Sequence, residues 1–187
     1  MNVSELAIPG VLLIEPRVLG DDRGWFMESW QRTRYEALGL PRRFVQDNLA
    51  FSAGGVLRGL HVQQPHPQGK LVQVLQGRVF DVAVDIRVGS PHFGRWVGVE
   101  LSGETQRQFY VPPGLAHGYY VLSREALFMY KCTDFYHPET ELGVRWDDPA
   151  IGIAWPLDGE PRLSVKDREA PLLRDLPAER LPQYPGS

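Results

Sequence analysis

Two short, glycine-rich segments each carry a histidine whose neighbours suit proton transfer or metal binding. The first, GVLRGLHVQ at 55–63, contains His61 and is followed by Lys70. The second, PPGLAHG at 112–118, contains His117. An imidazole can act as a base or as a metal ligand near neutral pH, and an ammonium can stabilise a negative charge that forms during a reaction. A single histidine in an apolar strand is more often a buried structural residue, so these segments alone leave a structural role open.

The second segment resembles the P-x-G-x-x-H element of the cupins, in which the histidine is normally a metal ligand. The first resembles the other cupin motif with its ligands replaced. His61-Val62-Gln63 stands in place of H-x-H, and Lys70 stands in place of the glutamate that precedes a glycine, here Gly77. A divalent metal needs neutral imidazoles and carboxylates that converge on one point, and an ammonium repels it. We therefore predict that His61 and His117 bind no metal, and that the protein needs no cofactor.

Further segments narrow the resemblance to one cupin family, the dTDP-4-dehydrorhamnose 3,5-epimerases. They follow the family's order from about residue 5 to residue 175, and they are specific in combination. They read DRGWFME (22–28), QDN (46–48), VLRGLH (56–61), QGKLV (68–72), FDVAVDIR (80–87), GLAHG (114–118), YKCTDFY (130–136), WDDP (146–149) and LSVKD (163–167). The resemblance implies one all-β domain over 1–187. It would be a cupin jelly-roll barrel with a few short helices, mostly in the N-terminal third and the C-terminal arm, and a tail at 176–187.

The resemblance also implies an isomerase that epimerises dTDP-4-dehydro-6-deoxy-D-glucose at C3 and C5. The product, dTDP-4-dehydro-L-rhamnose, would supply L-rhamnose to surface polysaccharide such as lipopolysaccharide O-antigen. Epimerisation beside a ketone needs a base, an acid on the opposite face of the carbon, and hydrogen-bond donors near the oxygen that becomes an enolate. The family pattern makes His61 the base, with Asp167 holding its tautomer. Tyr130 is implied to return a proton from the opposite face, and Lys70 to stabilise the enolate.

A second group of residues is assigned by the same pattern to the nucleotide and the sugar. Arg58, Arg23 and Lys166 are implied to bind the pyrophosphate, which a guanidinium can hold through two hydrogen bonds. Tyr136 is implied to stack on thymine, and His117 to contact the sugar. The remaining residues assigned to substrate binding are Glu28, Gln46, Asp47, Asn48 and Glu141. Arg23 and Glu28 are implied to reach a neighbouring subunit's site, so the resemblance implies a homodimer with exchanged N-terminal strands.

Each assigned residue also has a structural interpretation when its neighbourhood is considered alone. Tyr130 lies on an apolar strand face and would be core. Asp167 would be a helix or turn cap, and Arg23 with Glu28 would be an exposed ion pair of little energetic weight. The functional assignment therefore depends on the joint pattern of motifs.

Other functions remain open at this stage. The nearest alternative is an epimerase that inverts only C3 or only C5 of a related dTDP-4-keto-6-deoxysugar for a secondary metabolite, because it needs the same base and enolate stabiliser. Retention of Tyr130 favours the double epimerase. A metal-dependent cupin dioxygenase or isomerase would need the missing ligands, and a non-catalytic sugar-nucleotide binding module would need no base.

Composition excludes several broader classes of protein. The chain has 187 residues, 43% hydrophobic and 23% charged, which is typical of one globular domain. Its formal net charge of −3 gives no basic excess for nucleic acid. Cys132 is the only cysteine, which indicates a reducing compartment. No apolar run approaches the roughly 18 residues of a membrane span. The sequence therefore predicts a cytoplasmic protein without a nucleic-acid or membrane partner.

The elements that must position these residues are mostly short strands. Apolar residues alternate in 80–87, 97–101 and 126–133, and Gly- and Pro-rich turns separate the runs, which indicates a β-sandwich or barrel. One short helix is predicted from Ser29 to Leu38, with Ser29 as its cap and Gly39 just beyond its end. From residue 147 onward the chain loses this periodicity. We expect an arm that lies on the barrel, with residues 183–187 disordered.

One conflict in this pattern leads to a structural prediction. Strict alternation points Arg58 and His61 to opposite faces of their strand, although the family pattern places both at one cavity. We therefore predict a β-bulge at Gly59. Departures from the family are small: Val62 replaces an aromatic residue, Tyr119 replaces Phe, and the loop 64–68 is about one residue shorter.

Overall fold

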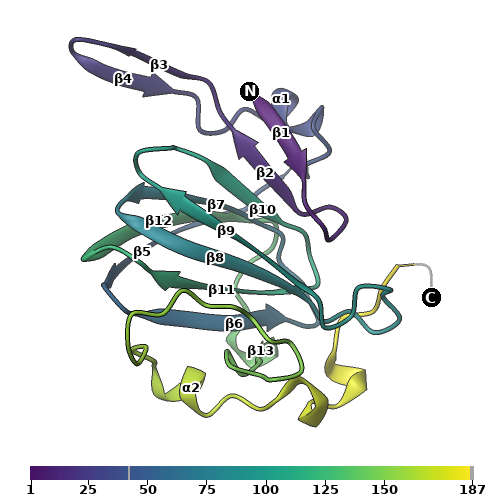
Figure 1. The fold of residues 1–187 in the computed structure, drawn as a ribbon. Coiled ribbons are helices and arrows are strands. Elements are labelled where there is room, and N and C mark those ends of the chain that lie inside the picture. The colour runs from purple at the N-terminus through teal and green to yellow at the C-terminus, as the bar shows by residue number, and fades with distance from the viewer. Residues whose placement is uncertain (42, 186–187) are drawn as a thin grey trace.

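The fold consists of two antiparallel sheets that face each other, as seen in a computed structural model that describes residues 1–41 and 43–185 (Figure 1). The first sheet has the order β1 (Asn2–Glu5), β2 (Leu12–Glu15), β10 (Gln108–Val111), β7 (Lys70–Gln76), β12 (Glu125–Cys132) and β5 (Gln46–Ala53). The second has the order β13 (Glu141–Gly143), β6 (Leu57–Gln63), β11 (Leu115–Val121), β8 (Arg78–Asp85) and β9 (Trp96–Ser102). This arrangement confirms the predicted all-β, cupin-type sandwich.

Outside the two sheets lie one hairpin and a few short helices. Strands β3 (Val18–Asp21) and β4 (Gly24–Met27) form a hairpin that projects away from the barrel (Figure 1). The helical segments are α1 (Arg32–Glu36), α2 (Val165–Arg168) and three 3-10 turns at Pro138–Thr140, Leu173–Asp175 and Ala178–Arg180. None of the helices in the described ranges is long and apolar enough to cross a membrane.

Apolar side chains form one core between the sheets and another outside the second sheet. The inner core includes Val72, Leu101, Phe109 and Phe128, all with 1% exposure or less. The outer core lies beneath the C-terminal arm and includes Val82, Val84, Ile86, Leu173 and Leu181. Strand β8 is therefore buried on both faces. Its apolar face packs under the arm, and its other face, which carries Asp81 and Ala83, points into the barrel.

The predicted N-terminal helix is shorter than the sequence pattern indicated. It covers Arg32–Glu36, and its cap is Gln31, whose side chain accepts a 2.7 Å hydrogen bond from the Arg34 backbone. The prediction that Ser29 caps the helix is wrong. Ser29 lies before the helix, where its carbonyl accepts hydrogen bonds from Tyr35 Oη (3.1 Å) and Gln108 Nε2 (2.7 Å). Gly39 follows the last turn with φ +87°, as predicted.

The C-terminal arm lies on the barrel, as predicted, but it is ordered further than expected. Gln183 forms a parallel bridge with Val88, and the Tyr184 backbone donates a 3.0 Å hydrogen bond to the Val88 carbonyl. The prediction of disorder is therefore wrong for residues 183–184, because the chain just after β8 offers them backbone partners. Residues 186 and 187 lie outside the described ranges.

Strand β6 is interrupted at Gly59 where it passes β11. His117 pairs with His61, and Tyr119 pairs with Arg58. Between these pairs, two residues of β6, Gly59 and Leu60, lie opposite the single residue Gly118 of β11. Gly59 has φ +126°, and a Cβ added there would lie 2.6 Å from the Gly118 Cα. This irregularity confirms the predicted bulge, and Arg58 and His61 both border one cavity.

Replacing Gly59 with alanine should destabilise the protein, because the added Cβ has no room and the backbone conformation is strained for an L-residue. We expect a loss of at least about 2 kcal/mol in the free energy of unfolding, measured by urea denaturation. Gly55→Ala is the matched control, since Gly55 also has positive φ (+76°) but would meet nothing within 4 Å. Equal losses in the two variants would contradict the close approach of β6 and β11.

Candidate active site

A cavity of about 310 Å³ lies between the two sheets and is lined by residues from both of them. It gathers most of the side chains that the sequence assigned to catalysis and substrate binding. Those on its wall are Gln46, Asn48, Arg58, His61, Lys70, His117, Tyr130, Tyr136 and Glu141. Asp167 and Lys166 lie behind this wall and contact His61 and Glu141, respectively.

His61 and Asp167 form a close pair of titratable side chains at the cavity. His61 Nε2 lies 2.6 Å from Asp167 Oδ1, with the histidine side chain 27% exposed and the aspartate 6% exposed. The chain places Asp167 in α2, where Ser164 caps the helix by accepting a 3.1 Å hydrogen bond from the Asp167 backbone. The same hydroxyl donates to Asp167 Oδ2 at 2.8 Å. Both carboxylate oxygens of Asp167 are therefore held in place.

The protonation state of Asp167 fixes the tautomer of His61. Burial favours a raised pKa for Asp167, but hydrogen bonds from His61, Ser164 and the Gly59 backbone outweigh it, and the pKa is lowered overall. A carboxylate can only accept a hydrogen bond, so the ring proton of His61 lies on Nε2. The unprotonated Nδ1 remains available to take a proton.

Lys70 and Tyr130 contribute two further polar groups to the cavity wall. Burial lowers the pKa of Lys70, against the opposing effect of Cys132, Glu141 and Asp81. Burial also raises the pKa of Tyr130 to about 12, so its phenol keeps its proton near neutral pH. Tyr130 comes from β12 in the first sheet, whereas His61 comes from β6 in the second. A base and a proton donor therefore stand on opposite walls of one cavity.

A second histidine–aspartate pair lies deeper in the barrel. His117 Nε2 is 2.8 Å from Asp81 Oδ1, and Asp81 is fully buried on β8. Burial raises the pKa of Asp81 and lowers the pKa of His117. Asp81 Oδ2 is buried without a hydrogen-bond partner among the described residues. The sequence patterns assigned no role to Asp81. The feature that could have identified it as a site residue is its place in an otherwise apolar strand, on the face that points into the barrel.

The donor set of this cavity does not fit a divalent metal. Gln63, which stands in place of the second histidine, turns its amide toward a loop. Its Nε2 donates to the carbonyls of His66 (2.7 Å) and Phe135 (2.9 Å), and its Oε1 accepts from the His137 backbone at 2.8 Å. Within residues 1–41 and 43–185, no group of three or more His, Cys, Asp or Glu side chains is placed to hold a metal ion. Gln63 instead anchors the loop that carries Tyr136.

Tyr136, Glu141 and Lys166 form a hydrogen-bonded cluster at the rim. Tyr136 Oη donates to Glu141 Oε2 at 2.7 Å, and Lys166 Nζ donates to the same oxygen. The Tyr136 backbone donates to Gln46 Oε1 at 2.9 Å, and Gln46 Nε2 donates to Asn48 Oδ1 at 3.0 Å. The ring of Tyr136 stays half-exposed at the mouth of the cavity.

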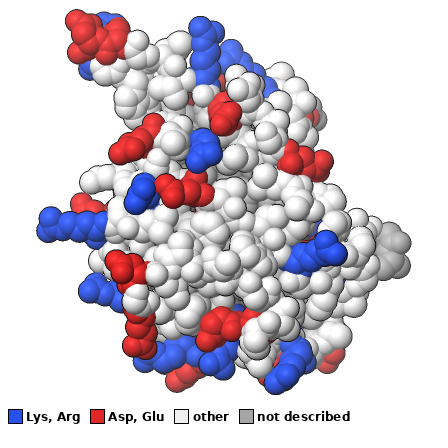
Figure 2. Space-filling model, in the orientation of Figure 1, with Lys and Arg blue, Asp and Glu red and all other residues white. Residues whose placement is uncertain are grey.

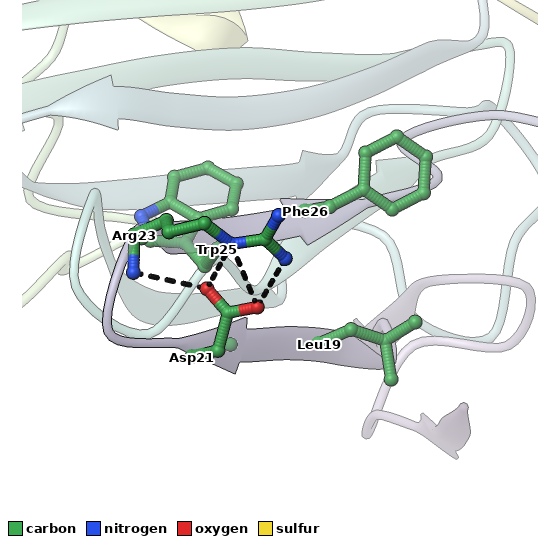
Figure 3. Close-up of a pocket in the computed structure, with 7 residues that line it drawn as sticks. Leu19, Asp21, Arg23, Trp25 and Phe26 are labelled. Carbon is green, nitrogen blue, oxygen red and sulfur yellow. Dashed lines mark hydrogen bonds and ion pairs between the residues drawn. The ribbon is translucent and has the colours of Figure 1, made fainter.

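Three residues assigned to substrate binding do not reach the cavity of their own chain. Arg23 lies in the β3–β4 turn, where its side chain is 85% exposed and pairs with Asp21 at 2.5 Å (Figure 3). Glu28 pairs with Arg34 at 2.9 Å. Asp47 pairs with Lys131 at 2.8 Å on the opposite side of β5 from Gln46 and Asn48.

The hairpin has a hollow of about 360 Å³ of its own, but only hairpin residues line it. Arg23 and Asp21 bond each other there, and the remaining side chains are Leu19, Trp25 and Phe26 (Figure 3). Its carboxylate, Asp21, is paired with Arg23 and no histidine lines it, whereas the barrel cavity combines His61, Asp167 and Tyr130. Acidic and basic side chains are interspersed on the face drawn in Figure 2, which shows no extended basic area.

A two-sheet barrel with a His–Asp pair and a protonated tyrosine on opposite walls defines a cupin-type protein of the proton-transfer class. Comparison with known families narrows this class. Residues 5–175 match the family model described as dTDP-4-dehydrorhamnose 3,5-epimerase. The chain belongs to this family of isomerases.

Individual relatives agree with the family assignment. The dTDP-4-dehydrorhamnose 3,5-epimerase of Pseudomonas aeruginosa is 56% identical over 176 residues, which cover 94% of this chain and 97% of that protein. A crystal structure of a dTDP-6-deoxy-D-glucose-3,5-epimerase from Legionella pneumophila, in complex with dTDP-4-keto-L-rhamnose, superposes with a TM-score of 0.96. The two sequences are 57% identical, and the match covers 98% of each chain. A dTDP-4-dehydrorhamnose 3-epimerase of Streptomyces niveus is 42% identical over 187 residues, covering 98% of this chain and 90% of that protein.

Asp167→Asn should lower kcat by about 10²- to 10⁴-fold, because the neutral amide no longer fixes the His61 tautomer or stabilises the imidazolium. Asp175→Asn, an exposed aspartate of the same arm, is the matched control and should leave kcat unchanged. Because folding lowers the pKa of Asp167, the stability it contributes is present above its unfolded pKa of about 3.9. That stability is lost as the pH falls through the folded value, so the variant should lose less stability on acidification. Retention of full kcat in Asp167→Asn would contradict the role of Asp167 in fixing the tautomer of His61.

Proposed function

We propose that the protein converts dTDP-4-dehydro-6-deoxy-D-glucose to dTDP-4-dehydro-L-rhamnose by inverting C3 and C5. The observation that carries this proposal is the placement of His61, ordered by Asp167, and Tyr130 on opposite walls of one cavity. The Pseudomonas aeruginosa and Legionella pneumophila relatives support the choice of reaction and of nucleotide sugar.

In the proposed reaction the C4 ketone acidifies the hydrogens on both C3 and C5. Nδ1 of His61 takes one of these protons, the C–H electron pair forms a carbon–carbon double bond, and the ketone oxygen becomes an enolate. Lys70, which comes from the same sheet as Tyr130, stabilises that oxygen as a hydrogen-bond donor. Asp167 stabilises the imidazolium that results.

Protonation of the enolate from the opposite face completes each inversion. Tyr130 donates its phenolic proton to the carbon, and the ketone re-forms. The phenolate and the imidazolium then return to their starting states by exchange with solvent, which would place solvent hydrogen at the inverted carbon. A second round at the other carbon, after the ring is presented differently, uses the same two residues.

The nucleotide would bind at the mouth of the cavity. Arg58 lies there with its guanidinium partly free, since Nε donates to Ser52 Oγ at 3.1 Å. Arg58 and Lys166 would bind the pyrophosphate. The half-exposed ring of Tyr136 would stack on the thymine, and His117 would contact the sugar. Gln46, Asn48 and Glu141 would hydrogen-bond the base and the sugars.

We further propose a homodimer in which the β3–β4 hairpin and Glu28 complete the neighbouring site. Trp25 and Phe26 on the hairpin are 58% and 68% exposed, and Leu49 and Phe51 on β5 are 67% and 62% exposed. Exposed apolar side chains of this size are typical of a protein–protein interface, which supports the proposed dimer. Light scattering would measure the dimer mass. Mixing inactive Arg23→Ala and His61→Ala proteins should restore activity, because a mixed dimer keeps one intact site. No recovery on mixing would contradict the exchange.

A single-position epimerase is the second candidate, because the Streptomyces niveus relative is a 3-epimerase. The Pseudomonas aeruginosa and Legionella pneumophila relatives favour double inversion, since both are 3,5-epimerases. The cytoplasmic location and the absence of a metal stay predictions, which cell fractionation and metal analysis of the purified protein test.

Incubation with dTDP-4-dehydro-6-deoxy-D-glucose in D2O should incorporate deuterium at both C3 and C5 with conversion to the L-sugar, as followed by NMR. His61→Ala should abolish both exchanges, because it removes the base. Exchange at one carbon only would identify the single-position epimerase. Tight binding without any exchange would contradict catalysis and identify a sugar-nucleotide binding module.

A further inference from the structure

A second carboxylate approaches His61 from the side opposite Asp167. In the pairing of β13 with β6, Glu141 opposes Gln63, and Gly143 opposes His61. Side chains two positions apart on a strand share a face, so Glu141 is the diagonal neighbour of His61. Because residue 143 is a glycine, β13 places no side chain of its own directly across from His61.

The two oxygens of Glu141 have different environments. Oε2 accepts hydrogen bonds from Tyr136 Oη (2.7 Å) and from Lys166 Nζ. Oε1 has neither of these partners and lies 3.9 Å from His61 Nδ1. The hydrogen bonds at Oε2 thus hold the carboxylate with its other oxygen toward the ring nitrogen that Asp167 leaves unprotonated.

Glu141 carries a negative charge in this position. Burial favours a raised pKa for Glu141, but hydrogen bonds from Lys166 and Tyr136 and the nearby His61 outweigh it, so the pKa is lowered. The Glu141 side chain is only 12% exposed, whereas that of Lys166 is 53% exposed. Solvent therefore screens the lysine more than the carboxylate, and the field of Glu141 at the imidazole is not cancelled.

We propose that Glu141 is a positioning residue that acts through His61: it orients the Nδ1 edge and stabilises the imidazolium formed when Nδ1 takes the substrate proton. This role rests on the proposed function and adds to it, since it gives Glu141 a part in proton transfer besides hydrogen-bonding the substrate. The protonated ring would lie between two anions, Asp167 at Nε2 and Glu141 at Nδ1.

Other charged and titratable groups also act on His61, and the experiment must separate them from Glu141. His117 lies across from His61 on β11 and is itself buried against Asp81. The titratable and charged groups on the elements that pack around His61 are Asp167 and Lys166 on α2, Glu141 on β13, Lys70 on β7, His117 on β11, Asp81 on β8, Tyr130 on β12 and Tyr136 on the loop before β13.

Glu141→Gln is the informative substitution, because it removes the charge and keeps an oxygen that can accept from Tyr136 and Lys166. We expect kcat to fall about tenfold or more, since a less basic imidazole takes a proton more slowly. Loss of the anion favours the neutral ring, so the acid limb of the kcat profile should move to lower pH. The matched control is Glu139→Gln, a nearby exposed carboxylate that pairs with His137 instead.

NMR titration gives a readout that does not depend on turnover. The imidazole resonance that disappears in His61→Ala should titrate at lower pH in Glu141→Gln than in the unchanged protein, and Glu139→Gln should leave it in place. An unmoved resonance, or a raised KM with unchanged kcat and pH profile, would overturn the proposal and leave Glu141 as a substrate ligand only. If the unchanged protein catalyses no exchange at C3 or C5, the proposed function itself fails, and this role for Glu141 fails with it.

Discussion

The close crossing of β6 and β11 at Gly59 and Gly118 is the constraint on which the site depends. A Cβ on Gly118 would lie 2.7 Å from the Arg58 carbonyl, so neither glycine has room for a side chain. The crossing adds one residue to β6 between the pairing positions of Arg58 and His61. Without it, alternation would turn one of them out of the barrel. The Gly59 backbone also helps to lower the pKa of Asp167, which links this crossing to the aspartate that orders His61.

The C-terminal arm both covers the second sheet and carries the aspartate that orders His61. Its apolar side chains cover the outer face of the second sheet, and α2 brings Asp167 to His61 from the same side. Burial of the arm therefore positions the residue that fixes the histidine tautomer. Inside the barrel, the charges of Asp81 and Lys70 lie near each other and near His117, so ionisable groups in a low-dielectric interior partly compensate one another.

The sequence was sufficient for the strands and for most of the cavity wall. Alternation predicted the strands, and the conflict between Arg58 and His61 predicted the bulge at Gly59. Sequence patterns did not reveal Asp81, because an aspartate in a strand is ordinarily solvated. They also placed Ser29 in the helix, since its carbonyl contacts with Tyr35 and Gln108 are long-range. Arg23, Glu28 and Asp47 lie away from their own chain's cavity. The sequence pattern implied a contact with a neighbouring subunit for Arg23 and Glu28 but not for Asp47.

A crystal structure of the His61→Asn variant with the dTDP-sugar substrate would show on which side of the sugar ring each proton-transfer residue lies. We expect a sugar ring inside the barrel, with residue 61 on one face of C3 and C5, Tyr130 on the other, and the diphosphate at Arg58. A sugar bound outside the barrel, or with both residues on the same face of the ring, would contradict this expectation.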